Sequence, residues 1–505
     1  MGSLRSLFFE NTESQGCSWL EKKRSKLPIF CDNNAHGAVR KSGTIAIFCG
    51  NAEKSKRKDK IKMILIGNGR LITKGTKNQF FENGAVAIDG SLIVAVGETK
   101  KLRKEYASAE FIDAGGGVIM PGLINAHNHI YSAFARGLSI EGYAAKSFPE
   151  ILDGLWWTID RNLSLEDTYY SAMATFIDCI RNGCTTVFDH HASYGGIRGS
   201  LFKIADAAKE LGVRASLCYE VSDRDGEDKM REAVAENADF IRFAMAEKSD
   251  MIKGMMGMHA SFTLSDDTIA LCRENTPDDI GFHIHVAEGM EDVNDSIKKY
   301  NKRVIERLSD LGILGKNTIT GHCIHVDDNE LGIIKDTDTM VVHNPESNMG
   351  NAVGIPPCME MVKRDILLGL GTDGYTNDMF ESEKVANVIH KHELKDPGAA
   401  WGEVPKMLFY NNAAMCERAF SVKTGVLMPG AAADIIVCDY VPLTPMSADN
   451  VDGHVLFGMS GRSVVTTVIN GVVRMKDREL IGIDADAFLA KCREVSAELW
   501  RRINN

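Results

Sequence analysis

The sequence predicts an α/β protein in which a (β/α)8 TIM-like barrel is flanked by a small β-sandwich domain that both ends of the chain form. Two observations predict the barrel. The central part of the 505-residue chain alternates strand-like and helix-like segments, and eight apolar strand-like runs can be counted in it. A third observation predicts the flanking domain, because short apolar runs separated by Gly and Asn turns follow Met63 and return near the C-terminus.

These patterns divide the chain into three parts. Residues 1–62 form a basic extension that ends in a run of charged residues, and we expect it to be disordered or to reflect a misassigned start. Residues 63–115 and 425–505 are expected to meet in the small β-domain. Residues 116–424 are expected to form the catalytic barrel, whose length suits a fold of this kind.

Eight strands are predicted for the barrel, with stretches between them that are long enough for helices, such as Glu166–Arg181 and Ser200–Leu211. The active site of such a barrel is expected at the carboxyl ends of its strands. The predicted strand segments are Val118–His129, Thr185–His190, Val213–Glu220, Lys253–His259, Ile280–Glu288, Thr318–His325, Thr339–Pro345 and Ile366–Gly374.

Charge and composition narrow the class of partner. Residues 1–62 hold 13 basic and 6 acidic residues, a balance of +7, so the net charge of −11 leaves −18 on the rest. An acidic body argues against nucleic acid and favours a small-molecule substrate. No apolar run reaches membrane-spanning length, no secretory signal follows Met1, and twelve cysteines without a C-x-x-C pair fit free thiols in the cytoplasm. The sequence leaves open whether the chain forms a homo-oligomer.

His127 and His129 stand two residues apart at the end of the first predicted strand, so both side chains point to one face and can hold one metal ion. Such a pair is more often incidental when it stands alone. Here it follows the apolar run Val118–Leu123, and burying two imidazoles without partners would cost free energy. The position therefore favours a metal site.

Other strand ends carry the same kinds of side chain. His283 and His285 repeat the two-residue spacing at the fifth strand, and Glu288 follows where that strand gives way to a loop. Asp373 ends the eighth strand in a Gly-flanked turn. A core histidine pair and a simple turn carboxylate are the alternatives for each segment alone. The carboxyl ends of barrel strands converge, however, and this convergence favours a single site.

His322 at the sixth strand and His259 at the fourth would add polar groups to the same rim, although each alone is more often a buried core imidazole. Trp156 and Trp157 follow the first strand and could stack on a flat heterocycle. Core packing is the alternative interpretation for both tryptophans.

Five motifs occur in the order found in the amidohydrolase superfamily, and the sequence resembles the mononuclear branch of that superfamily. This branch holds cytosine, guanine and S-adenosylhomocysteine deaminases and triazine chlorohydrolases. The greatest likeness is to SsnA-type aminohydrolases, through the segments 188–193 and 218–226. The five motifs are Pro121–His129, His285–Glu288, Gly321–His325, His343–Asn348 and Gly371–Gly374.

The resemblance implies a role for each matching residue. It makes His127, His129, His285 and Asp373 the ligands of one divalent metal ion, with Zn²⁺ favoured and Fe²⁺ as the alternative. It makes Glu288 the proton shuttle, while His322 would hydrogen-bond the reacting group and His259 would contact the substrate. Met258 replaces the proline of the family pattern, and Glu346 replaces a small or hydroxyl residue, so the identity of the substrate stays open.

The function that these residues imply is hydrolysis of a carbon–nitrogen bond in a purine- or pyrimidine-like ring, with release of ammonia. A metal ion lowers the pKa of bound water from about 15.7 towards about 7 to 9. The same site could instead expel chloride or hydrolyse an imine or a cyclic amide. A non-catalytic scaffold would be expected to have lost ligands, and a metal store would need a closed coordination shell.

Overall fold

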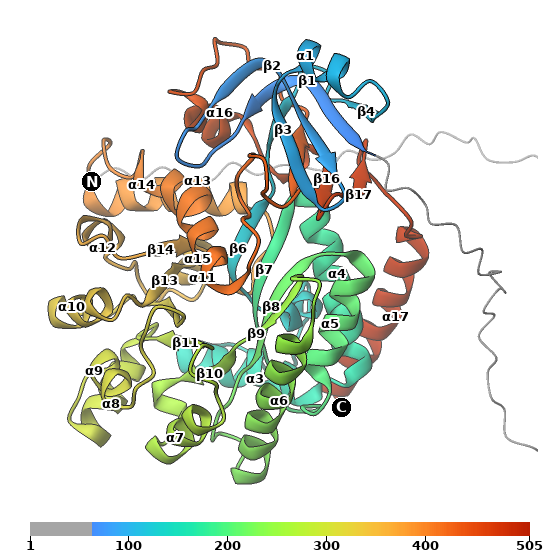
Figure 1. Cartoon of the computed structure of the whole chain (residues 1–505). Helices are drawn as coiled ribbons and strands as arrows, with labels where there is room; N and C mark the ends of the chain where they lie inside the picture. Colours follow the sequence, from blue (N-terminus) through green and yellow to red (C-terminus); the bar gives the residue numbers. More distant parts are fainter. Residues whose placement is uncertain (1–62) are drawn as a thin grey trace, which may run out of the picture. The chain divides into compact units, whose positions relative to one another are not determined.

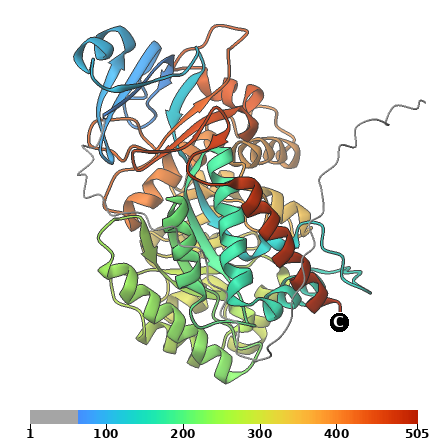
Figure 2. The same ribbon diagram turned by 90° about the vertical axis from the view of Figure 1, so that its right-hand side faces the viewer.

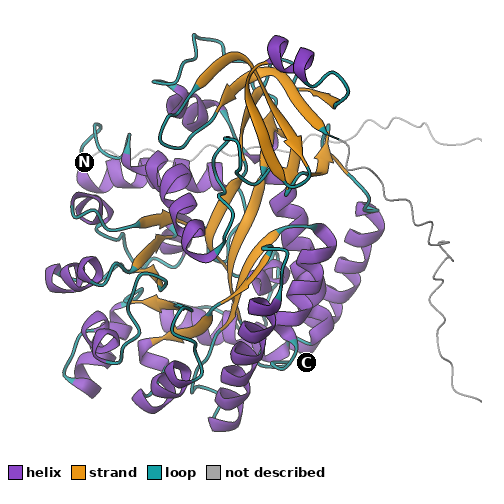
Figure 3. Ribbon diagram, in the orientation of Figure 1, coloured by secondary structure: helices purple, strands orange, loops and turns teal. Residues whose placement is uncertain are grey.

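The computed structural model describes residues 63–505, and the predicted basic extension, residues 1–62, lies outside them. Within this part of the chain, helices surround the strands (Figure 3). The α/β character that the sequence predicts is confirmed, and the central strands run parallel. No helix in residues 63–505 is long and apolar enough to cross a membrane.

The central strands form two parallel sheets in a TIM-barrel-like arrangement, with the strand orders β6-β7-β8-β9 and β10-β11-β12-β13-β14. Every residue of β7, β8, β11 and β12 is buried, as expected for parallel strands that are covered on both faces. Isolated bridges join Asn128 to Asp373 and Val221 to Met258, so the two sheets contact each other where β6 meets the end of β14 and where the end of β8 meets β10. The strands are β6 (Leu123–Asn128), β7 (Cys184–His191), β8 (Arg214–Tyr219), β9 (Ile252–Gly254), β10 (Met256–Ala260), β11 (Phe282–Val286), β12 (Ile319–His322), β13 (Met340–His343) and β14 (Leu368–Leu370).

Helices cover the outside of these sheets. Those in the connections between the parallel strands or directly after them are α2 (Phe148–Ile151), α3 (Trp157–Asn162), α4 (Leu165–Asn182), α5 (Ser200–Leu211), α6 (Glu227–Ala246), α7 (Asp266–Glu274), α8 (Met290–Tyr300), α9 (Val304–Asp310), α10 (Asp328–Asp336), α11 (Pro345–Gly350), α12 (Cys358–Lys363), α13 (Met379–Leu394), α14 (Glu403–Pro405) and α15 (Asn412–Ala419).

Local sequence sets the bounds of α4. Ser164 and Asp167 cap its first turn reciprocally, because each side chain accepts from the backbone N–H of the other, at 3.2 and 2.7 Å. The helix ends at Gly183, which has a left-handed φ of 76°. Arg502 of α17 (Ala485–Ile503) pairs with Asp167, so the last helix of the chain packs along α4, as Figure 2 shows.

Strands from both ends of the chain share one sheet (Figure 1). Its path is β18-β17-β16-β15-β5-β1-β2-β3, and β4 pairs with β1. The structure shows this as one nine-stranded sheet, and the predicted two-layer sandwich stays a prediction. The elements are β1 (Ile64–Ile72), β2 (Phe80–Asp89), β3 (Leu92–Glu98), α1 (Thr99–Glu105), β4 (Glu110–Asp113), β5 (Val118–Pro121), β15 (Ile435–Cys438), α16 (Val451–Gly458), β16 (Val464–Ile469), β17 (Val472–Lys476) and β18 (Glu479–Leu480).

The predicted strand Val118–His129 is wrong in one respect, because it divides at Gly122 into β5 and β6, which belong to different sheets. The N–H of Gly122 donates to the carbonyl of Asp434, whereas the next N–H, of Leu123, donates to the carbonyl of Gly183. A Cβ at Gly122 would lie 2.3 Å from Cγ2 of Thr185, so the crossing requires glycine. The predicted strand Lys253–His259 divides in the same way at Met255.

Candidate metal centre and pocket

The carboxyl ends of the parallel strands bring together the four residues that the sequence predicts as metal ligands. His127 and His129 stand at the end of β6, His285 lies in β11, and Asp373 follows β14. All four side chains are buried. Ring nitrogens of the three histidines lie within 4.8 Å of one another.

Hydrogen bonds fix where the protons of two of these imidazoles sit. Nδ1 of His129 donates to the carbonyl of His190 at 2.5 Å, and Nδ1 of His285 donates to the carbonyl of His259 at 3.0 Å. Because a carbonyl can only accept, a neutral ring keeps a bare lone pair on Nε2. The two Nε2 atoms nevertheless lie 3.2 Å apart. Burial lowers the pKa of His129, but the carboxylate of Asp373 outweighs this effect and raises that pKa to about 9, so a proton lies between these nitrogens in the metal-free protein and a divalent ion would take its place.

The remaining two groups fit the same cation. Nε2 of His127 is buried and has no hydrogen-bond partner, while its Nδ1 lies 2.8 Å from Nε2 of His283. Oδ1 of Asp373 lies 3.0 Å from Nε2 of His129. Three imidazoles and one carboxylate form a donor set that suits Zn²⁺ or another first-row divalent ion.

Burial prepares these groups for a metal. It lowers the pKa of His127 and His285 well below the ordinary value, so both rings are neutral and free to ligate at pH 7. Burial by itself would raise the pKa of Asp373, but its contacts with His129 and His322 hold that pKa well below the usual range. The carboxylate is therefore ionised.

Glu288 and His322 lie beside this centre. Oε2 of Glu288 is 3.5 Å from Nε2 of His322, and Asn351 donates its amide to Oε1 of Glu288 at 3.2 Å. Nε2 of His322 is also 3.4 Å from Oδ2 of Asp373, and its Nδ1 lies 2.7 Å from the amide oxygen of Asn348. Burial raises the pKa of Glu288, which suits a group that must carry a proton near neutral pH.

The backbone around these side chains is strained. Ala287, His322, Cys323 and Asp373 all have positive φ values, between 46° and 67°, a region that non-glycine residues rarely adopt. Such outliers cost of order 1–3 kcal/mol each and persist only where the surrounding structure fixes them. The strain turns the strand ends sharply and aims Asp373 and His322 at one point.

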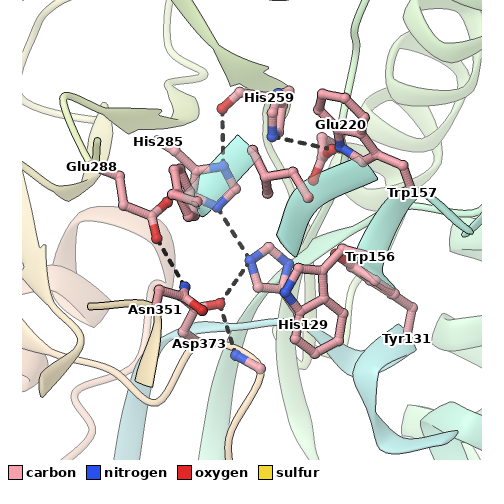
Figure 4. Close-up of a pocket in the computed structure, with 13 residues that line it drawn as sticks. His129, Tyr131, Trp156, Trp157, Glu220, His259, His285, Glu288, Asn351 and Asp373 are labelled. Carbon is pink, nitrogen blue, oxygen red and sulfur yellow. Dashed lines mark hydrogen bonds and ion pairs between the residues drawn. The ribbon is translucent and has the colours of Figure 1, made fainter. Parts of the chain in front are cut away.

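A pocket of about 450 Å³, including its open mouth, lies over this point (Figure 4). Its polar lining comes from His129, His285, Glu288 and Asp373 on one side and from Glu220 and His259 on the other. The apolar wall consists of Tyr131, Phe148, Leu152, Trp156 and Trp157. Flat aromatic side chains beside a polar base are typical of sites that hold a planar heterocycle.

The structure places the predicted substrate-contacting residues in this pocket as well. His259 and Trp156 both line it, and Trp156 packs edge-to-face against Tyr131 with ring centroids 6.1 Å apart. His322 is fully buried behind Glu288 and Asp373 and does not line the pocket.

Sequence reasoning assigned no role to several lining residues. Glu220 ends a predicted strand, so its position was a usable signal, and His190, which it faces, ends the neighbouring one. Asn351 and Phe148 lie on connections without a pattern, and only the folded chain brings them to Glu288 and to the mouth of the pocket.

The profile of the Amidohydrolase family matches residues 118–474. The 5'-deoxyadenosine deaminase of Methanosarcina barkeri is 30% identical over 448 residues, which cover 87% of this chain and 99% of that protein. A zinc-bound adenosine deaminase from Xanthomonas campestris has a TM-score of 0.76 and 22% identity over 86% of this chain and 98% of that one. Atrazine chlorohydrolase TrzN from Arthrobacter aurescens, complexed with zinc, has a TM-score of 0.74 and 21% identity, over 86% of this chain and 100% of that one. At these identities the two structures show a shared fold.

Proposed function

Because the chain belongs to the amidohydrolase family, we propose that it is an aminohydrolase that replaces the amino group of a nitrogen heterocycle by oxygen and releases ammonia. The relatives that share the whole length of the catalytic part are deaminases of adenine nucleosides, so hydrolytic deamination of a heterocycle is the reaction they support. The observation that carries the proposal is the set of buried imidazole nitrogens that converge with Asp373 and Glu288 under an aromatic pocket.

His127, His129, His285 and Asp373 are proposed to hold one divalent ion, with zinc favoured over iron(II) by the donor set. When bound, such an ion makes a water molecule nucleophilic at neutral pH. Asp373 then accepts a proton from the attacking water. Glu288, whose pKa burial raises, protonates the ring nitrogen next to the carbon that bears the amino group.

The remaining residues bind and orient. His322 donates to Asn348 through Nδ1, which leaves its Nε2 facing both reacting carboxylates. His259 is proposed to contact the substrate, and Trp156 to pack against the ring. Water adds to the ring carbon, Asp373 passes the proton that it took from the water to the amino group, the carbon–nitrogen bond breaks, and ammonia leaves while the ring nitrogen keeps the proton from Glu288.

The proposal also includes a closed barrel, a cytoplasmic location and membership of the SsnA-type subgroup. The two bridges between the parallel sheets support one closed (β/α)8 barrel. The nine cysteines in residues 63–505 are free and buried, which suits a cytoplasmic protein. The segments around Phe188 and Cys218 support the SsnA-type subgroup.

The test is an ammonia-release screen of metal-loaded protein against aminopurines, aminopyrimidines, pterins and triazines. Ammonia from at least one planar heterocycle is the expected result. Chloride or a ring-opened product without ammonia would favour the alternative hydrolase reactions. No turnover by protein with a full complement of metal would favour the non-catalytic scaffold.

A further inference from the structure

The pocket has a second polar region that the proposed reaction does not use. It consists of Glu220, which follows β8, His190 of β7 and His259 of β10, and we call it the acceptor corner. Figure 4 shows Glu220 beside His259 and Trp157, on the side of the pocket away from Glu288 and Asp373. The Glu220 side chain is 3% exposed, so neighbouring groups and not bulk water must satisfy it.

The proton of His259 points away from Glu220. Nδ1 of His259 lies 2.8 Å from the hydroxyl of Thr263, and that hydroxyl donates its own hydrogen to the carbonyl of Ala260. The hydroxyl has one hydrogen, so it must accept from His259. Nε2 of His259 lies 3.8 Å from Oε1 of Glu220, which is too far for a hydrogen bond, so this ring gives the carboxylate none.

His190 repeats the arrangement. Its Nε2 lies 3.0 and 3.1 Å from the carbonyls of Met258 and His283, so this nitrogen carries the hydrogen. Its Nδ1 is buried without a hydrogen-bond partner and lies 3.4 Å from Oε2 of Glu220, which is long for a hydrogen bond to a carboxylate. The His190 ring therefore gives the carboxylate no well-made hydrogen bond.

Within residues 63–505, Arg224 is the other cation that acts on Glu220, and it helps to lower the pKa of that carboxyl without forming a hydrogen bond to it. The guanidinium of Arg224 forms its ion pairs with Asp160 and Asp225 and packs over the ring of Tyr194. A carboxylate can accept several hydrogen bonds, and a buried one without them costs free energy. Glu220 lines the pocket, so a molecule in the pocket can provide them.

We propose that Glu220 accepts hydrogen bonds from N–H groups of the substrate ring, and that the enzyme thereby selects free heterocyclic bases over their N-alkylated or nucleoside forms. This inference rests on the proposed function and names the substrate class of the same site.

Distance favours a donor on the ring over a hydroxyl on a sugar. A carboxylate oxygen of Glu220 lies within 4.8 Å of a ring nitrogen of His285 and, in a second grouping, of one of His129. Both histidines belong to the metal centre at which the ring carbon must sit. The group that donates to Glu220 must therefore lie close to the reacting carbon, on the ring itself and not on an attached sugar.

The experiment compares wild type with Glu220→Gln on adenine, 9-methyladenine, 2,6-diaminopurine and 5'-deoxyadenosine. We expect wild type to favour adenine over 9-methyladenine by about 10²-fold or more in kcat/KM, because a site built to bind an N–H discriminates strongly against its loss. In Glu220→Gln, kcat/KM for adenine should fall by about 10-fold to 100-fold, mainly through KM, and the preference should nearly vanish. If 2,6-diaminopurine loses more than adenine does, the added amino group supplies the donor.

Two measurements separate the possible failures. Calorimetric Kd values of metal-depleted protein for adenine should rise in Glu220→Gln, and the metal content of reconstituted protein should not change. If adenine binds more tightly to wild type than to Glu220→Gln but no ammonia is released, the proposed function is refuted and the role of the acceptor corner in binding is supported. The control is Glu383→Gln, which alters an equally buried carboxylate near Lys74 that does not line the pocket, and it should leave the preference unchanged.

Four results would overturn the inference. The preference for adenine over 9-methyladenine could be equal in wild type and Glu220→Gln, or none of the four purines could bind. Wild type could favour 5'-deoxyadenosine over adenine, with this advantage lost in Glu220→Gln, which would assign Glu220 to sugar hydroxyls. Reconstituted wild type could hold a second metal ion that Glu220→Gln loses, in which case the corner is a cation site.

Discussion

Glu288→Gln separates proton transfer from metal binding. Oε2 of Glu288 lies 3.5 Å from Nε2 of His322, Oε1 accepts from the amide of Asn351, and the glutamine keeps an oxygen for that amide. Metal content should therefore stay near one ion per chain. The rate of ammonia release should fall by about 10²–10⁴, the usual contribution of general acid–base catalysis, which equals about 2.7–5.4 kcal/mol in activation free energy.

The assay is elemental analysis and ammonia release on the same samples. Glu291→Gln is the matched control, since it makes the same chemical change three residues further on at an exposed position, and it should keep the wild-type rate. Asp373→Ala removes a ligand and the base together, so metal content and rate should fall together. Loss of metal from Glu288→Gln, or two tightly held ions in wild type, would refute this division of roles.

Three further predictions concern residues around the site. His283→Ala removes the imidazole 2.8 Å from Nδ1 of His127, so metal affinity measured by competition with a chelator should fall by about 10-fold to 100-fold, and an unchanged affinity would contradict the positioning role. Burial lowers the pKa of His191 to about 3. Between pH 3 and 6.5 the unfolded chain therefore binds a proton on His191 that the folded chain does not, and stability is lost as the pH falls through that range. In His191→Gln, the slope of the unfolding free energy against pH, measured by urea titration, should be smaller by up to about 1.4 kcal/mol per pH unit. Gly122→Ala places a Cβ 2.3 Å from Thr185 and should cost about 1–3 kcal/mol, whereas a melting temperature equal to wild type would show that the crossing tolerates a side chain.

Strand ends were the part of the site that could be read from the sequence. An apolar run followed by H-x-H, or by a Gly-flanked aspartate, marks a buried strand that finishes in polar side chains, and the order of these runs along the chain predicts which ends meet. His127, His285 and Asp373 were found in this way. The resemblance to the amidohydrolases then gave each of them a chemical role.

The sequence did not show where a predicted strand is interrupted. Val118–His129 reads as one continuous apolar run, but its backbone changes partners at Gly122, where one N–H goes to the carbonyl of Asp434 and the next goes to that of Gly183. A pattern of side chains does not show where backbone hydrogen bonds are made. The division into two sheets therefore appeared only in the folded chain.

The sequence by itself determined the α/β class, the chain order of the strand ends and the types of side chain at the centre, because periodicity and ligand chemistry are local properties. Only the tertiary structure decided which ring nitrogen of each histidine points to the metal centre. That depends on carbonyls from neighbouring strands, such as that of His190 for His129, 61 positions away. The same is true of Glu220, whose place opposite Glu288 follows from the way the strands curve around one pocket, a long-range packing outcome that no local pattern encodes.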